Sequence, residues 1–289
     1  MSRPPTLTLP AGARAYRLTT GRGEFAVHDA RPGPGVPARG TVLLVPGFTG
    51  SKEDFIAVLA PLAAAGYRAV AVDGRGQYES GGPRDESAYA QGELARDVLA
   101  QAAALGPHGA VHVVGHSLGG LISRAAALLD PGAFASLTLL SSGPAALCTV
   151  QQARTKMLVD ALPVMDMESV WQAMRALDPP EAPGAETPPA LRDFLHERWL
   201  VTVPEQLMAT GRQLVEEPDR VAELAAVPCP KHVVSGVLDY AWPVPWMDDM
   251  AQRLGARRTV VEGAAHSPAA ERPGATAEAL TAFWDGLGA

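Results

Sequence analysis

The sequence predicts an α/β fold in which a mostly parallel, doubly wound sheet carries an inserted helical segment. Short apolar runs alternate with stretches of helical periodicity in the first and last parts of the chain, as expected when helices connect parallel strands. The alternation stops after Ser142 and resumes near Cys229, and only helical patterns lie between these residues. The run Gly115-His116-Ser117-Leu118-Gly119 also stands between an apolar run and a helical one, which is typical of a strand–turn–helix unit.

The first part of the chain shows the alternation most clearly. Strands are predicted where apolar runs are continuous, because strands buried on both faces of a parallel sheet have this pattern. The predicted strands are residues 25–28, 41–45, 69–72, 110–114 and 136–140. The predicted helices are residues 51–65, 86–105 and 118–129. In the first helix Ser51 can act as the N-cap, and Phe55, Leu59 and Leu62 share one apolar face.

The second part of the chain begins with helical patterns alone. Apolar residues at helical spacing predict helices at residues 153–177, 190–202 and 204–217, with a proline-rich stretch at 178–189. Strands at residues 231–237 and 258–261 then alternate with helices at 244–254 and 276–287. We therefore predict a core made of residues 1–143 and 228–289, and a helical cap insertion at residues 144–227.

Composition and charge exclude several classes of protein. Hydrophobic residues make up 47% of the 289 residues and the net charge is −7, so a globular protein is expected and a nucleic-acid partner is not. No apolar run reaches the roughly 18 residues of a membrane span, and the N-terminal segment has no hydrophobic signal core, so we expect a cytoplasmic location. Cys148 and Cys229 lack disulfide-framework or metal-ligand spacing, and we expect neither a cofactor nor a metal. The sequence does not determine the oligomeric state.

Ser117 lies in a G-x-S-x-G pattern, the nucleophile elbow in which a sharp turn between strand and helix presents a serine hydroxyl. Glycine is expected at positions 115 and 119 because a Cβ there would clash with neighbouring chain. The alternative for Ser117 is a helix N-cap, but the flanking strand and helix favour the elbow. His116 cannot easily turn back toward its neighbour, so we assign it a packing role. Ser117 is therefore the predicted nucleophile.

A serine nucleophile needs a general base and a carboxylate that orients the base. Among the seven histidines, His266 lies among small residues just after the last predicted strand, where catalytic groups collect in parallel sheets. Asp239 ends the preceding strand-like run, and Ser117, Asp239, His266 is the chain order of this motif. The alternative for His266 is a surface loop residue. Asp73 precedes a Gly-Arg-Gly turn and is assigned a structural contact with Arg75.

Cleavage of an acyl bond also needs donors for the negative charge that develops on the carbonyl oxygen. One predicted donor is the N–H of Leu118, the residue after the nucleophile. The second is predicted in the loop after the strand at 41–45, where Gly47 lets the backbone approach closely and Phe48 offers its N–H.

Together these residues resemble the α/β-hydrolase superfamily over about residues 41–142 and from Cys229 onward. The resemblance rests on Pro46-Gly47-Phe48, Asp73-Gly74-Arg75-Gly76, Gly115-His116-Ser117-Leu118-Gly119, Gly236 with Asp239, and His266. It implies a nucleophile at Ser117, an acid at Asp239, a base at His266, and oxyanion amides at Phe48 and Leu118. Many relatives have a histidine where this chain has Pro46, a difference that a backbone donor tolerates. Relatives often carry a helical cap after the sixth strand, which residues 144–227 resemble.

A serine nucleophile argues against the aspartate-nucleophile branches of this superfamily, the dehalogenases and epoxide hydrolases. It favours a carboxylesterase- or lipase-like serine hydrolase that cleaves an ester-type bond (carboxylester, thioester or lactone) of a small apolar substrate. Trp171 and Met174 of the predicted cap are candidate substrate-binding residues, although such an apolar stripe more often packs in a core. Alternatives are an acyltransferase, a C–C bond hydrolase, a peptidase, a haloperoxidase-like relative, or a non-catalytic binding member of the fold.

Overall fold

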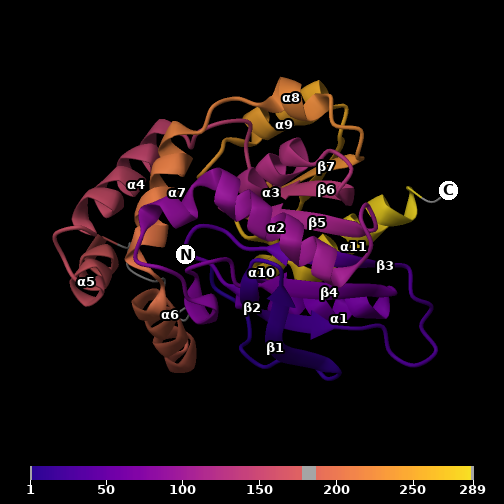
Figure 1. The fold of residues 1–289 in the computed structure, drawn as a ribbon, viewed down its shortest axis with the longest axis horizontal. Helices are drawn as coiled ribbons and strands as arrows, with labels where there is room; N and C mark the ends of the chain where they lie inside the picture. Colours follow the sequence, from indigo (N-terminus) through magenta and orange to yellow (C-terminus); the bar gives the residue numbers. More distant parts are fainter. Residues whose placement is uncertain (1, 178–186, 288–289) are drawn as a thin grey trace.

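The computed structural model describes residues 2–177 and 187–287, and these form an eight-stranded sheet with helices on both sides (Figure 1). The strand order is β1-β2-β4-β3-β5-β6-β7-β8. The pairs β1–β2 and β2–β4 are antiparallel and the other pairs are parallel, which confirms the predicted mostly parallel α/β sheet. The strands are β1 (Ala13–Thr20), β2 (Gly23–Ala30), β3 (Gly40–Val45), β4 (Tyr67–Val72), β5 (Val111–His116), β6 (Phe134–Leu140), β7 (Lys231–Gly236) and β8 (Arg257–Val261).

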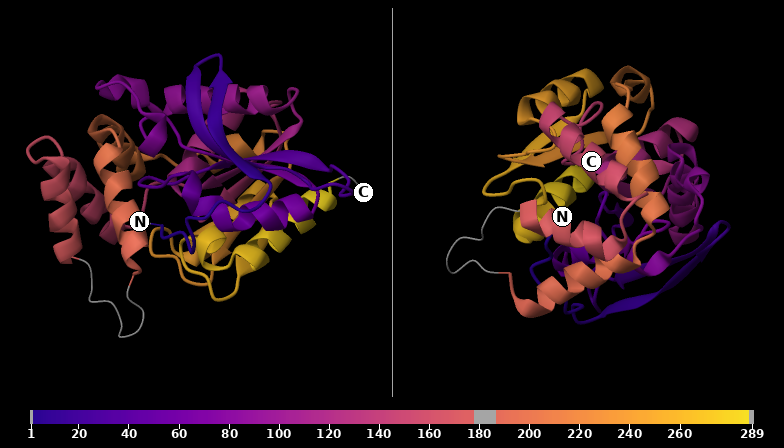
Figure 2. Two further views of the ribbon diagram at one scale, coloured as in Figure 1. Left: turned by 90° about the horizontal axis from the view of Figure 1, so that it is seen from below. Right: turned by 90° about the vertical axis from the view of Figure 1, so that its left-hand side faces the viewer.

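Two layers of helices cover the two faces of the sheet (Figure 2). One face packs against α2 (Gln91–Leu105), α3 (Leu118–Leu129), α8 (Val221–Ala225) and α9 (Val244–Leu254). The other packs against α1 (Ile56–Ala64), α10 (Pro268–Glu271) and α11 (Pro273–Asp285). Successive strand residues alternate between the layers, so that Val113 packs in the first and Val114 in the second. The central strands are therefore apolar at nearly every position, which explains their continuous runs in the sequence.

Five helices of the described residues lie between β6 and β7 in the chain. One of them, α8, packs against the sheet, and the other four form a separate group. They are α4 (Thr149–Ala161), α5 (Met167–Leu177), α6 (Pro189–Val201) and α7 (Pro204–Glu216). They gather at one end of the molecule, to the left of the sheet in Figure 1. Their own apolar cluster contains the buried residues Leu162, Val170, Trp171, Phe194, Leu195, Trp199 and Leu207. Arg198 of α6 joins this group to the core, because its guanidinium lies 2.8 Å from Asp54 and both side chains are almost fully buried.

Several elements differ from the sequence prediction. Strand β1 was not predicted from the sequence, because this edge strand exposes most of its side chains and pairs only with β2 within the sheet of described residues. The helix predicted at residues 153–177 is two helices, α4 and α5, with Pro163 in the connection. The proline-rich stretch falls mainly on residues 178–186, outside the described residues. Every helix within the described ranges is too short or too polar to cross a membrane.

Two histidines lie on central strands of the sheet: His112 on β5 is half-buried and His232 on β7 is fully buried. Burial lowers the pKa of His112 to about 4 and that of His232 to about 3, from an ordinary value of 6.5. For His232, the nearby Arg257 and Arg258 lower the pKa further. The unfolded chain binds protons on these rings below about pH 6.5, whereas the folded chain resists protonation until the lowered pKa is reached. These rings therefore cost no stability above about pH 6.5, and stability is lost as the pH falls from there toward about 3.

We expect His232→Phe to reduce this loss of stability in acid. Between about pH 6 and pH 4, the free energy of unfolding of the wild type should fall by about 1.4 kcal/mol per pH unit more than that of the variant. Thr259→Val is the matched control: the Thr259 hydroxyl lies 2.8 Å from His232 Nε2, so this variant removes the hydrogen bond and keeps the titrating ring. Urea unfolding at each pH measures the slopes. Equal slopes in the wild type and His232→Phe, or a reduced slope in Thr259→Val, would contradict the prediction.

Candidate active site

The turn between β5 and α3 has the geometry of a nucleophile elbow. Ser117 stands alone between the strand and the helix, with φ 54° and ψ −120°, a backbone conformation that L-residues rarely adopt. A Cβ at Gly115 would lie 2.3 Å from the carbonyl oxygen of Gly119, and one at Gly119 would lie 2.4 Å from that of Val45. Both positions therefore require glycine, because the strand, the helix and the end of β3 are in direct backbone contact.

The structure brings Ser117, His266 and Asp239 together in one hydrogen-bonded row. His266 Nε2 lies 3.1 Å from Ser117 Oγ, and His266 Nδ1 lies 2.9 Å and 3.0 Å from the two carboxylate oxygens of Asp239. The Asp239 carboxylate can only accept a hydrogen bond, so Nδ1 of His266 carries the proton. Nε2 is then free to accept a hydrogen bond from the serine hydroxyl. The three side chains come from the carboxyl ends of β5, β7 and β8, as the sequence predicted for residues far apart in the chain.

Backbone and side-chain contacts hold the row in place. The N–H groups of Ala241 and Trp242 donate to Asp239 Oδ1 at 2.8 and 3.1 Å, which orients the carboxylate. His116 Nε2 donates to the main-chain oxygen of His266 at 2.8 Å. Burial lowers the pKa of His116 to about 3, with a smaller contribution from His266, so its ring stays neutral. His116 thus packs beside the row as expected, and it also anchors the loop that carries His266.

The two predicted oxyanion amides lie next to Ser117. Leu118 is the first residue of α3, and Phe48 lies in the loop after β3. Within the described residues neither N–H has a hydrogen-bond acceptor. The two segments touch, because a Cβ at Gly47 would lie 3.2 Å from Ser117 Cβ. Two unpaired donors beside a serine hydroxyl, one of them at a helix N-terminus, form an environment that favours negative charge.

A buried ionic network supports the loops after β3 and β4. The backbone N–H of Lys52 donates to Asp73 at 2.7 Å, and its ammonium group lies 2.9 Å from the same carboxylate. The expected contact between Asp73 and Arg75 is therefore wrong. The Arg75 guanidinium instead bonds to Asp97 at 2.6 Å. The loops are joined by a lysine that local sequence patterns did not single out, because its partner is 21 residues away.

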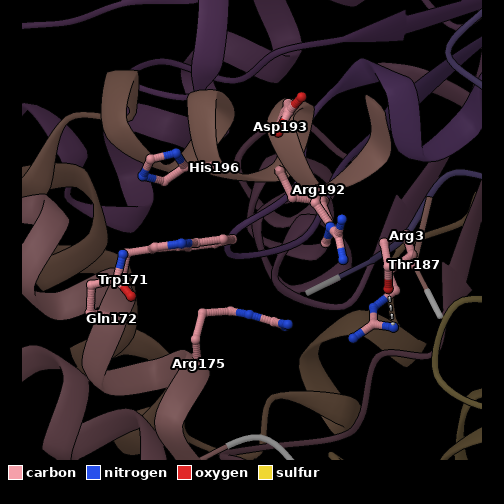
Figure 3. Close-up of a pocket in the computed structure, with 9 residues that line it drawn as sticks. Arg3, Trp171, Gln172, Arg175, Thr187, Arg192, Asp193 and His196 are labelled. Atoms are coloured by element: carbon pink, nitrogen blue, oxygen red, sulfur yellow. Dashed lines mark hydrogen bonds between the residues drawn. The ribbon is translucent and has the colours of Figure 1, made fainter. Parts of the chain in front are cut away.

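Trp171 and Met174, the candidate substrate-binding residues, lie in the helical insertion. Trp171 lines a cavity of about 220 Å³ between α5 and α6, with its ring between His196 and Arg175 in the view of Figure 3. The other lining residues are Arg3, Gln172, Thr187, Arg192, Asp193 and Leu195. None of Ser117, Asp239 and His266 lines this cavity. Met174 packs against the apolar cluster that contains Trp171. The geometry therefore favours packing for both residues.

Phe48, Val159 and Gly211 connect the helical insertion to the Ser117 region. The Phe48 side chain packs against both the core cluster and the cluster of the inserted helices. A Cβ at Gly211 of α7 would lie 3.2 Å from Phe48 Cζ and 2.5 Å from Val159 Cγ2 of α4. Neither Gly211 nor Val159 was predicted from the sequence, although a glycine inside a predicted helix is a signal of close packing. Among the described residues, no group of three or more His, Cys, Asp or Glu side chains is arranged to hold a metal ion.

Comparisons with known proteins point to one family. Residues 42–279 match the model of the Alpha/beta hydrolase family. Over 107 residues the chain is 39% identical to the "Putative carbamate hydrolase RutD" of Variovorax paradoxus (strain S110); the match spans 37% of this chain and 40% of that protein. The fold is similar to that of a thermophilic esterase from Thermogutta terrifontis, with a TM-score of 0.75 and 22% identity over 95% of this chain and 99% of that one.

A second solved structure shares the fold. It is an epoxide hydrolase from an endophytic Streptomyces, with a TM-score of 0.70 and 26% identity over 96% of this chain and 97% of that one. The family match runs from β3 into α11 and includes the turn that carries Ser117. The protein belongs to the alpha/beta hydrolase family.

Proposed function

We propose that the protein is a serine hydrolase that cleaves an ester-type bond of a small apolar substrate through an acyl-enzyme. One observation carries the proposal: His266 bonds to Ser117 Oγ through one ring nitrogen and to Asp239 through the other. This is the arrangement in which a weak nucleophile gains a base and the base gains an orienting acid.

The reaction follows from these contacts. Ser117 Oγ attacks the carbonyl carbon while His266 Nε2 takes the hydroxyl proton, and Asp239 stabilises the resulting imidazolium. The N–H groups of Phe48 and Leu118 bind the oxyanion of the tetrahedral intermediate. The C–O bond to the leaving group then breaks, and His266 gives its proton to the departing alkoxide. Water repeats the sequence on the acyl-enzyme, releases the carboxylic acid and restores the serine.

Two of the similar proteins are named for substrates other than carboxylic esters, namely an epoxide and a carbamate. An epoxide lacks a carbonyl carbon, and here a serine stands at the elbow, so the likeness to an epoxide hydrolase supports the fold rather than that substrate. A carbamate has a carbonyl carbon that the same serine can attack. The name of the RutD relative therefore makes carbamates the second substrate class to test.

We further propose that residues 144–227 act as a cap over the site. Helix α7 approaches the Phe48 side chain at Gly211, where Val159 of α4 also packs, and the backbone N–H of Phe48 is a proposed oxyanion donor. Apolar side chains at this contact would form the wall that faces the acyl chain, and Phe48, Val159 and Gly211 are the residues we assign to it. The cap would then set the length of acyl chain that the enzyme accepts.

A fluorophosphonate probe and a series of p-nitrophenyl esters test the proposed function. The probe is expected to label the wild type at Ser117, as shown by peptide mass spectrometry, and to block ester turnover with one equivalent bound. Esters of increasing acyl length, with an aryl carbamate as a further substrate, define the substrate class. A wild type that is neither labelled nor active on any of these compounds would exclude the proposed function.

We expect Gly211→Ala to shift the acyl-chain preference toward shorter esters. The added methyl group must displace Val159, which lies nearest, and it also presses against Phe48. One methylene of space in an apolar pocket typically changes specificity by about 10- to 200-fold. The ratio of kcat/KM for a long and a short p-nitrophenyl ester measures the shift. Trp171→Phe and Met174→Leu are the controls, and we expect them to lower Tm without changing that ratio. A changed ratio in the controls together with an unchanged ratio in Gly211→Ala would place the acyl site beside Trp171 instead.

A further inference from the structure

Gln77 bridges the loops that follow β3 and β4, and it is only 5% exposed. Its side-chain Nε2 donates to the carbonyl oxygen of Gly47 at 2.7 Å, with a longer contact of 3.4 Å to that of Phe48. Its Oε1 accepts from the N–H of Gly74 at 3.0 Å. The amide has one orientation, because a carbonyl on one side needs a donor and an N–H on the other needs an acceptor.

The Gly47 carbonyl belongs to the same peptide unit as the Phe48 N–H. A trans peptide is planar, and its C=O and N–H bonds point in opposite directions. The hydrogen bond that holds the Gly47 oxygen therefore also directs the Phe48 N–H away from Gln77. Glycine accepts a wide range of backbone angles, so the peptide that follows it can rotate at little cost unless its carbonyl is held.

The bond from Gln77 differs from the other contact to the same oxygen. The N–H of Gly50 also donates to the Gly47 oxygen, at 3.1 Å, but it belongs to the same loop. Gln77 comes from a separate loop, in which the neighbouring Asp73 accepts from the backbone of Lys52 at 2.7 Å. Among the described residues, only the hydrogen bond from Gln77 therefore ties the Gly47 carbonyl to a support outside its own loop.

We propose that Gln77 is a positioning residue for the oxyanion site: by holding the Gly47 carbonyl, it keeps the Phe48 N–H directed at the oxygen that becomes charged. The inference rests on the proposed function, because it assigns a support to one of the proposed oxyanion donors. Without Gln77 the peptide samples rotated states in which this donor is lost. The effect appears in the transition state, where the oxyanion exists, and not in the binding of the neutral ester.

The test compares Gln77→Met and Gln77→Glu with the wild type at pH 8. Methionine removes both hydrogen bonds, whereas an ionised glutamate still accepts from Gly74 and no longer donates to Gly47. Gln101→Met is the matched control, because Gln101 is a glutamine buried to 1% exposure near the same loops, with no hydrogen bond to Gly47 or Phe48. We measure kcat and KM on a p-nitrophenyl ester, the affinity for an alkyl trifluoromethyl ketone, and Tm.

We expect both Gln77 variants to lose about 10- to 100-fold in kcat, below the 10²–10³ typical of deleting a donor outright, with KM within about 2-fold. Affinity for the trifluoromethyl ketone, which forms an oxyanion on reaction with serine, is expected to fall by the same factor. Gln101→Met is expected to keep both values. Folded Gln77 variants with the wild-type kcat, or an equal loss in Gln101→Met, would overturn the inference. If Gln77→Met does not fold, Gln77→Glu decides. Failure of the proposed function is distinguishable, because the wild type itself would then be inactive and unlabelled.

Discussion

Replacing Ser117 by alanine is expected to lower kcat by about 10⁴- to 10⁶-fold, the scale of loss when a serine nucleophile is removed. The residual rate would come from substrate binding and the oxyanion donors, which the variant keeps. The fold should persist, because the variant removes one oxygen atom and alanine has the same Cβ as serine. The strained angles at this position follow from the close packing of Gly115 against Gly119 and of Gly119 against the end of β3.

Single-turnover kinetics and fluorophosphonate labelling measure this loss, and Tm checks the fold. Ser123→Ala is the matched control, since Ser123 is a fully buried serine of α3 whose hydroxyl has no hydrogen-bond partner among the described residues. We expect this control to keep both activity and labelling. Equal labelling of the wild type and Ser117→Ala would show that the nucleophile is another residue.

Replacing His266 by alanine is expected to cause a loss of similar size, because Ser117 then has no base and the leaving group has no proton donor. The two residues act as a unit. The double variant with Ser117→Ala should therefore lose about as much as either single variant, far less than the product of the two losses. Ester hydrolysis at high enzyme concentration measures the three rates, and circular dichroism confirms that each variant is folded.

The variant His116→Ala distinguishes the role of His116 from that of His266, the other histidine of the site. The His116 ring bonds to the backbone of His266 and not to Ser117, so its loss should reduce the rate and leave turnover measurable. A His266→Ala variant that retains activity, or losses that multiply in the double variant, would mean that Ser117 and His266 do not share one proton transfer.

Local patterns in the sequence were sufficient for seven of the eight strands, the elbow and several helices. Continuous apolar runs occur because the central strands are covered on both faces, and α3 and α9 have the bounds predicted from helical periodicity. The positions of Ser117, Asp239 and His266 could also be anticipated, since each follows a strand and parallel strands end at one edge of the sheet. These inferences need only the periodicity of neighbouring residues and one rule about strand direction.

Contacts between distant segments could not be read from the sequence. An amphipathic pattern shows that Trp171 is buried but not against what, and the fold places it beside a cavity in the inserted helices. Strand β1 has no apolar run because it lies at an exposed edge. Gln77 and Gly47 are 30 residues apart along the chain. Gln77 reaches Gly47 because β4 lies next to β3 in the sheet. Side-chain pairing of this kind depends on the order of the strands, and that order is decided by the packing of the whole chain.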